Sequence, residues 1–84
     1  AVKDHAKCLI LRMRSVPALD STALNAMTEL YGRCAQKGIT IILSHVNQQP
    51  MKVMEKAGFT RKIGAENICE NIDAAIKRAE ALVK

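Results

Sequence analysis

The stretch Val16-Pro17-Ala18-Leu19-Asp20-Ser21-Thr22-Ala23-Leu24 joins an apolar segment to an amphipathic one through an acidic, hydroxyl-rich turn. The preceding residues, 7–13, contain the run Cys8-Leu9-Ile10-Leu11, whose lack of polar alternation predicts a strand buried on both faces, as in a parallel sheet. Pro17 ends that strand because it has no N–H to donate to a neighbouring strand. Asp20 is well placed as the N-cap of the following helix, where its carboxylate accepts backbone N–H groups and meets the positive end of the helix dipole. The two hydroxyl residues after Asp20 then lie at the carboxyl end of a strand, where open α/β sheets usually meet ligands and partners.

The rest of the chain continues the alternation of strand and helix. Apolar residues three and four positions apart over 21–36 predict a helix, and Gly38 follows it as a C-cap glycine does. The β-branched run 39–43 predicts a second buried strand. Pro50 fits the first turn of the next helix, which Gly58 ends.

The last part of the chain predicts a brief strand around Ile63, Ile68 and Cys69, followed by a final helix that Asn71 or Asp73 opens. The inward positions of that helix are apolar: Ile72, Ala75, Ile76, Ala79, Leu82 and Val83. Parallel strands joined by a helix need a crossover connection. The order of elements therefore predicts an α/β layered domain with a mostly parallel sheet flanked by helices.

Length and composition narrow the class of protein. The 84 residues make a single domain spanning 1–84, and no apolar run approaches the roughly 20 residues of a membrane helix. Cys8, Cys34 and Cys69 are far apart, which predicts reduced thiols rather than a disulfide framework or a zinc site. The formal charge is +5, but one Tyr and one Phe cannot form a stacking platform for bases, so we expect no nucleic-acid partner.

No residue pattern of the chain indicates catalysis or metal binding. His5 and His45 are isolated, without a second ligand at the spacing that a metal site needs. No serine or cysteine nucleophile occurs in a recognisable signature with a histidine and an acid, and there is no glycine-rich phosphate loop. We therefore predict that the chain is not an enzyme and that it holds no metal and no cofactor.

Four stretches of the chain carry a more specific pattern. Residues 8–24 and 38–44 contain the two apolar strands and the Asp-Ser-Thr turn, and residues 54–59 and 63–68 follow them with an Ala-Gly-Phe and an Ile-Gly element. In order and spacing this pattern resembles the STAS domain of bacterial SulP-type anion permeases. The resemblance covers nearly the whole chain, and the turn and the two glycine elements are its distinctive parts.

The resemblance implies a regulatory and interaction domain at the carboxyl end of a transporter for sulfate or a similar anion, at the cytoplasmic face of the bacterial inner membrane. Its partner would be the transmembrane part of that transporter or a soluble cytoplasmic protein. We expect the contact surface at the helix start, formed by Asp20, Ser21, Thr22, Asn25 and His45.

Other functions stay open for the same turn. The fold also occurs alone in bacterial anti-sigma-factor antagonists, and the resemblance aligns the hydroxyl that is phosphorylated in those regulators with Thr22, next to Ser21. A phosphoryl group there would add about −1.5 to −2 charges beside Asp20, and would change a binding surface more than it stabilises the fold. Helix capping alone also explains an acid and hydroxyls at this place. A small nucleotide-binding module is a third alternative that rests on fold analogy, because the helix start lacks glycine.

The start of the chain differs from the family pattern. STAS domains ordinarily begin with one or two strands and a helix before the strand that starts at Lys7, and the chain lacks these elements. Their absence would leave an edge or a face of the sheet uncovered. We expect a fragment, a truncation or a homodimer paired across the exposed surface, because uncovered apolar edges associate.

Overall fold

The computed structural model of the chain describes residues 8–82, so the expectations for His5, Lys7 and Val83 fall outside the described residues. Its centre is a three-stranded sheet with the order β1-β2-β3. The strands are β1 (Cys8–Arg12), β2 (Thr40–Ser44) and β3 (Ile68–Cys69), and both neighbouring pairs are parallel. The predicted α/β class and the parallel pairing of the two apolar runs are confirmed.

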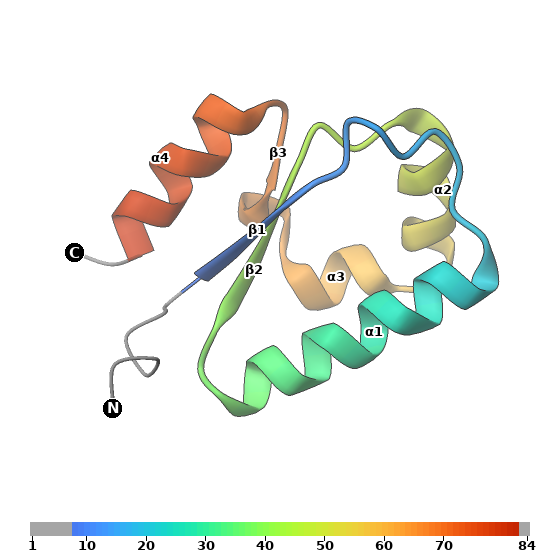
Figure 1. Ribbon diagram of the computed structural model, residues 1–84, viewed down its shortest axis with the longest axis horizontal. Coiled ribbons are helices and arrows are strands. Elements are labelled where there is room, and N and C mark those ends of the chain that lie inside the picture. Colours follow the sequence, from blue (N-terminus) through green and yellow to red (C-terminus); the bar gives the residue numbers. More distant parts are fainter. Residues whose placement is uncertain (1–7, 83–84) are drawn as a thin grey trace.

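Helices cover both faces of this sheet. Figure 1 shows the strands nearly edge-on, with α4 on one side and α1, α2 and α3 on the other. Contacts of α4 with β1 and β2, and of α1 and α3 with β2, agree with this layering. The helical segments are α1 (Ser21–Gln36), α2 (Gln48–Lys56), α3 (Phe59–Ile63), the 3-10 turn η2 (Ala65–Asn67) and α4 (Ile72–Leu82).

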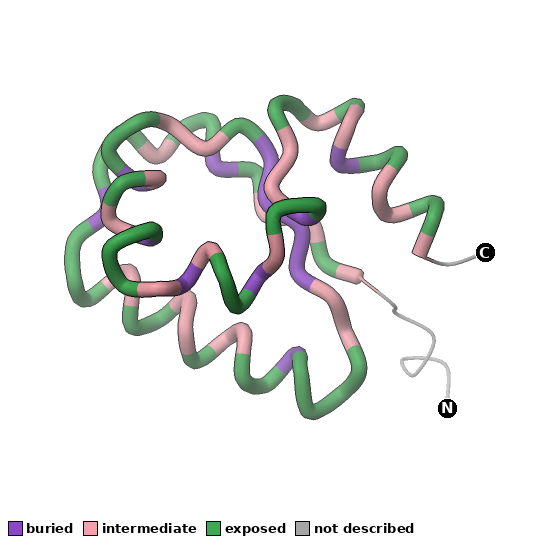
Figure 2. Tube along the Cα trace, turned by 180° about the vertical axis from the view of Figure 1, so that it is seen from behind, coloured by how far each residue is buried: buried purple, intermediate pink, exposed green. Residues whose placement is uncertain are grey.

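The alternation of side chains along β2 divides the interior into two layers. Ile41 and Leu43 point into the core beneath α1, α2 and α3, whereas Ile42 points toward α4, where Ala75 is equally inaccessible. In Figure 2 a buried stretch runs along the central strand, whereas most residues of the surrounding helices are exposed or intermediate. The larger layer consists of Met13, Leu19, Cys34, Ile41, Leu43, Met54, Phe59 and Ile63.

The helix predicted after the turn has the expected bounds. Asp20 lies in an extended conformation directly before α1, and Gly38 adopts a left-handed φ of 72° after its end. The amide of Ile39 donates to the Cys34 carbonyl at 2.8 Å, which closes the last turn in the way that a left-handed C-terminal glycine allows. Local sequence signals therefore fix both ends of this helix.

The segment between α2 and β3 differs from the sequence prediction. Ile63 ends the short helix α3 instead of joining a strand, and it is buried in the core. Gly58 and Gly64, with φ of 79° and 95°, bracket α3 and let the chain turn sharply on both sides of it. The strand begins only at Ile68, and its two residues pair with Leu43 and Ser44 at the end of β2.

The structure shows which residue caps α4 and corrects the expected inward packing of Ile76. Asn71 caps the helix, since its side-chain oxygen accepts the Ala74 amide at 2.8 Å, and Asp73 lies in the first turn. Ile76 does not pack inward, because 43% of it is exposed. Consecutive helical residues point about 100° apart, so when Ala75 faces the sheet its neighbour Ile76 turns away from it.

None of the helices within residues 8–82 has both the length and the apolar character that crossing a membrane requires.

Candidate functional site

The turn before α1 is a capped helix start that presents two hydroxyls. The Oδ1 atom of Asp20 accepts the amide of Ala23 at 2.8 Å, which confirms the predicted N-cap. Ser21 and Thr22 are the first two residues of α1 and both are exposed. Asn25 is exposed one turn further along the helix. The four expected surface residues of this helix start thus lie together in one short segment.

A side chain from a distant part of the sequence holds this turn in place. Leu19, only 5% exposed, anchors the turn in the core directly before the cap. Its amide donates to Oε1 of Gln49 at 2.7 Å, and Nε2 of Gln49 donates to the Leu19 carbonyl at 3.4 Å. The Gln49 amide therefore pairs with the backbone of the turn much as a neighbouring strand would.

Asn47 holds the first half of the same loop. Its Nδ2 atom donates to the carbonyl oxygens of Val16 at 2.9 Å, Arg14 at 3.1 Å and Met13 at 3.4 Å. Asn47 directly precedes α2 but makes no side-chain cap there, because its amide is turned toward the loop. Neither Asn47 nor Gln49 was predicted from the sequence to be part of the site. Two amide side chains after a buried strand were the available signal, but their partners lie 30 to 34 residues away.

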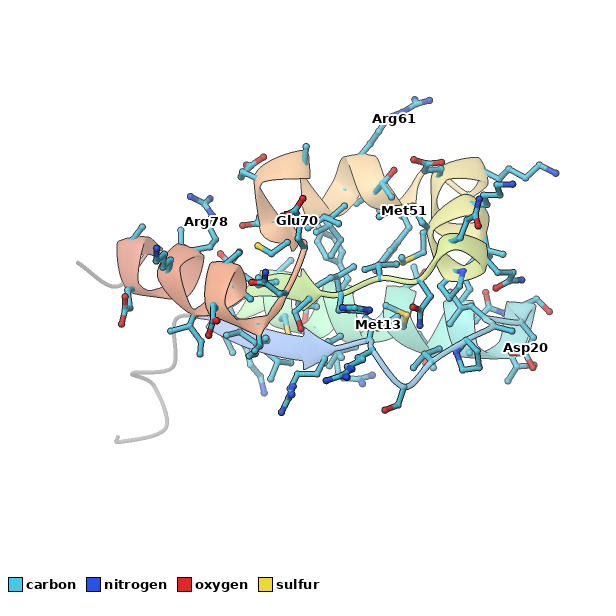
Figure 3. The ribbon with its side chains drawn as sticks, turned by 90° about the horizontal axis from the view of Figure 1, so that it is seen from above. Met13, Asp20, Met51, Arg61, Glu70 and Arg78 are labelled. Atoms are coloured by element: carbon cyan, nitrogen blue, oxygen red, sulfur yellow. The ribbon has the colours of Figure 1, made fainter. Side chains whose placement is uncertain are left out.

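His45 occupies a different place from the other expected surface residues. It lines a small cleft together with Arg12, Arg14 and residues at the start of α4, whereas none of the four residues at the start of α1 lines this cleft. Figure 3 shows Asp20 at the end of the molecule away from Arg78 of α4. Asp20, Ser21, Thr22 and Asn25 thus share the start of α1, whereas His45 lines a cleft to which none of them contributes.

A hollow also lies between α2, α3 and β3. It has a volume of about 550 Å³ and a partly apolar lining that includes Met51 and Ile68, with Glu55 and Arg61 as its charged residues.

Within residues 8–82 no three His, Cys, Asp or Glu side chains gather as a metal would require. Cys8, Cys34 and Cys69 are free thiols. At the start of α1 the chemistry available is hydrogen bonding by a carboxylate, two hydroxyls and an amide, and phosphorylation of Thr22 or Ser21 stays a prediction.

Comparison with known proteins shows which family and which proteins the chain resembles. A family model described as the STAS domain matches residues 1–75. A curated relative, a probable sulfate transporter 4.2 from Arabidopsis thaliana, is 33% identical over 58 residues, which are 69% of this chain and 9% of that protein. The chain therefore spans about a tenth of the length of that relative.

Two solved structures share the fold. A sulfate transporter family protein from Wolinella succinogenes has a TM-score of 0.87 and 35% identity, over 92% of this chain and 63% of the other. A STAS domain of a SulP transporter from Vibrio cholerae has a TM-score of 0.79 and 28% identity, over 90% of this chain and 58% of the other. Together with the family match and the parallel sheet between α1 and α4, these likenesses show that the chain belongs to the STAS domain family, as found in sulfate transporters of the SulP type.

Proposed function

We propose that the chain is a regulatory and interaction domain of a transporter for sulfate or a related inorganic anion. The observation that carries the proposal is the exposed helix start at Asp20, Ser21, Thr22 and Asn25, held rigid on a fold whose relatives are sulfate transporters. The proposed surface binds the transmembrane part of the transporter or a soluble partner at the cytoplasmic face of the membrane. The proposed role is non-catalytic.

The rigidity of the turn supports this role. Asn47 and Gln49 contribute five hydrogen bonds to backbone atoms between Met13 and Leu19, so the exposed side chains that follow keep one arrangement. A surface that is ordered before binding loses less conformational entropy on association. An exposed carboxylate, two hydroxyls and an amide also suit the polar rim of a protein interface.

The test compares two matched substitutions on α1 in a full-length transporter that carries this chain. Asn25→Arg places a bulky charge on the proposed surface, and Gln36→Arg places the same charge at the exposed far end of the same helix. Uptake of radiolabelled sulfate into membrane vesicles is measured for both variants and the wild type at equal protein levels. We expect Asn25→Arg to change uptake several-fold and Gln36→Arg to leave it near the wild-type rate.

Two results would contradict the proposal. Equal uptake by both variants and the wild type would show that the helix start makes no functional contact. Unchanged uptake after removal of the whole domain, with the transporter still in the membrane, would show that the domain does not regulate transport.

A further inference from the structure

A small cleft at the carboxyl ends of β1 and β2 gathers positive charge and hydrogen-bond donors. It has a volume of about 80 Å³ and lies beside the start of α4. Its lining consists of Arg12, Arg14, Ser44, His45, Asn71 and Ile72. Five of these residues carry polar side chains that can donate a hydrogen bond to an anion, and the sixth, Ile72, lies in the first turn of a helix.

The strands fix two of these side chains next to each other. Arg12 and Ser44 are partners in the parallel register of β1 and β2, so both point to the face of the sheet that α4 covers. The pairing continues past the cleft, because the Met13 amide donates to the Ser44 carbonyl at 2.9 Å. His45 follows with a left-handed φ of 54°, and its amide donates to the Cys69 carbonyl at 2.9 Å. The backbone beneath the cleft is therefore held from both neighbouring strands.

Ser44 is a nearly buried residue that supplies a hydroxyl to the cleft. The residue is 2% exposed, and its hydroxyl makes no hydrogen bond to any described residue. No side-chain polar atom of residues 8–82 is at once fully buried and unpartnered, so the small accessible part of Ser44 includes its oxygen. Since Ser44 lines the cleft, this hydroxyl opens into it. An oxyanion in the cleft could accept a hydrogen bond from this hydroxyl.

The start of α4 adds backbone donors. Asn71 accepts the amides of Ala74 and Ala75, through its side-chain oxygen at 2.8 Å and its carbonyl at 3.1 Å. The preceding amides of α4, those of Ile72 and Asp73, have no acceptor among the described residues. Free amides and the positive end of the dipole make this an environment that favours an anion.

The charges around the cleft also favour an anion. Arg12 and Arg14, both exposed, bring two positive charges to the cleft, and no acidic residue lines it. Two acidic residues flank the start of α4, Glu70 and Asp73, and both are exposed. Being solvated, they reduce the local positive potential without occupying the cleft.

We propose that this cleft binds a small tetrahedral oxyanion of the phosphate or sulfate class. Guanidinium groups pair with such oxygens in bidentate geometry, and the Ser44 hydroxyl and the free amides complete the set of donors. A volume of about 80 Å³ is well below the roughly 300 to 1,000 Å³ of sites for drug-sized ligands, so the cleft takes a single oxyanion group and not a whole nucleotide. The site is separate from the helix start at Asp20, and the proposal does not rest on the proposed function.

The test titrates the isotopically labelled chain with sodium phosphate and sodium sulfate at constant ionic strength and follows the backbone amides by NMR. We expect saturable shifts of the Ile72 and Asp73 amides. Arg12→Gln should weaken binding about tenfold, because it removes a charge-assisted contact. Ser44→Ala should weaken binding several-fold while it preserves the shape of the packed residue. Arg33→Gln is the matched control, since it removes the same charge from an exposed position on α1.

Some outcomes would overturn the proposal. Equal shifts with sodium chloride, or an equal loss of affinity in Arg33→Gln, would mean that only overall charge attracts the ions. Wild-type affinity in Ser44→Ala and in Arg12→Gln, with saturable binding retained, would place the anion elsewhere.

A vesicle arm of the experiment distinguishes a free ion from a lipid headgroup. Vesicles of phosphatidylcholine with phosphatidic acid are compared with vesicles in which phosphatidylserine gives the same surface charge. Displacement of bound phosphate by the phosphatidic acid vesicles alone would identify a phosphomonoester headgroup as the source of the oxyanion. Binding of the free ions with no displacement by either vesicle would identify the dissolved ion, and both results support an oxyanion site.

Discussion

The Asn47 side chain organises the loop that leads to the proposed partner surface. Its amide nitrogen contacts three carbonyl oxygens of residues 13–16, while its position before α2 would equally suit a helix cap. A carboxylate at this position could cap the helix but could not donate to carbonyl oxygens. The identity of the side chain therefore matters because it is a donor.

Asn47→Ala should lower the free energy of unfolding by about 1 to 2 kcal/mol, because the loop carbonyls lose their donor. Asn47→Asp should cost at least as much, although it retains the ability to cap α2. Urea denaturation monitored by circular dichroism measures both changes. Gln48→Ala, at the next and exposed position, is the control and should stay within about 0.5 kcal/mol of the wild type. If Asn47→Asp matched the wild type, capping of α2 and not bracing of the loop would be the role of Asn47.

At the scale of elements, α1 combines a defined start with an exposed face that we propose as the partner surface. The Asp20 cap at 2.8 Å and Gly38 beyond its end fix the length of the helix, and Leu19 fixes its entry into the core. The hydroxyls of Ser21 and Thr22 are exposed, so the capping residue and the residues of the proposed contact are neighbours in the chain. Asp20 stabilises the helix start, while the two hydroxyls are available to a partner.

Asp20→Ala should lower the free energy of unfolding by about 1 kcal/mol through loss of the cap. For a domain of this size that corresponds to a fall of roughly 4 to 8 °C in Tm. Asp20→Asn keeps a side-chain oxygen for the Ala23 amide and should lose only a few tenths of a kcal/mol. Differential scanning calorimetry measures both variants, and an unchanged Tm in Asp20→Ala would contradict a stabilising cap.

At the scale of the whole molecule, the sheet has an accessible edge. Among the described residues β1 pairs on one side only, with β2, and its Leu9 is 37% exposed. The matched STAS structures are longer than this chain, which spans 63% and 58% of them. A strand edge with an exposed apolar residue favours pairing with another chain.

The 84-residue chain should therefore self-associate reversibly as its concentration rises, and Leu9→Lys should weaken the association by placing a charge at the edge. Sedimentation velocity over a concentration series measures the effect. Ala26→Lys, at an exposed position of α1, adds the same charge elsewhere and should leave the association unchanged. A wild-type chain that stays monomeric over the whole series would contradict the prediction.

Sequence alone determined the features that depend on near neighbours. The bounds of α1, its Asp20 cap, the glycine after it and the parallel pairing of the two apolar strands follow from capping chemistry and hydrophobic periodicity, which act within a few residues. The α3 helix could not be predicted from the sequence, because five residues between two glycines are too few to show a helical pattern of apolar residues.

Only the tertiary structure decided which distant residues meet. Gln49 and Asn47 reach the turn across 30 or more residues, and the cleft combines β1, β2 and the start of α4. Such contacts depend on how the crossover connections close over the sheet, and that closure brings together residues that no local pattern links. The capped turn at Asp20 could therefore be predicted from the sequence. The hydrogen bonds that hold this turn and the cleft of the proposed anion site could be seen only in the tertiary structure.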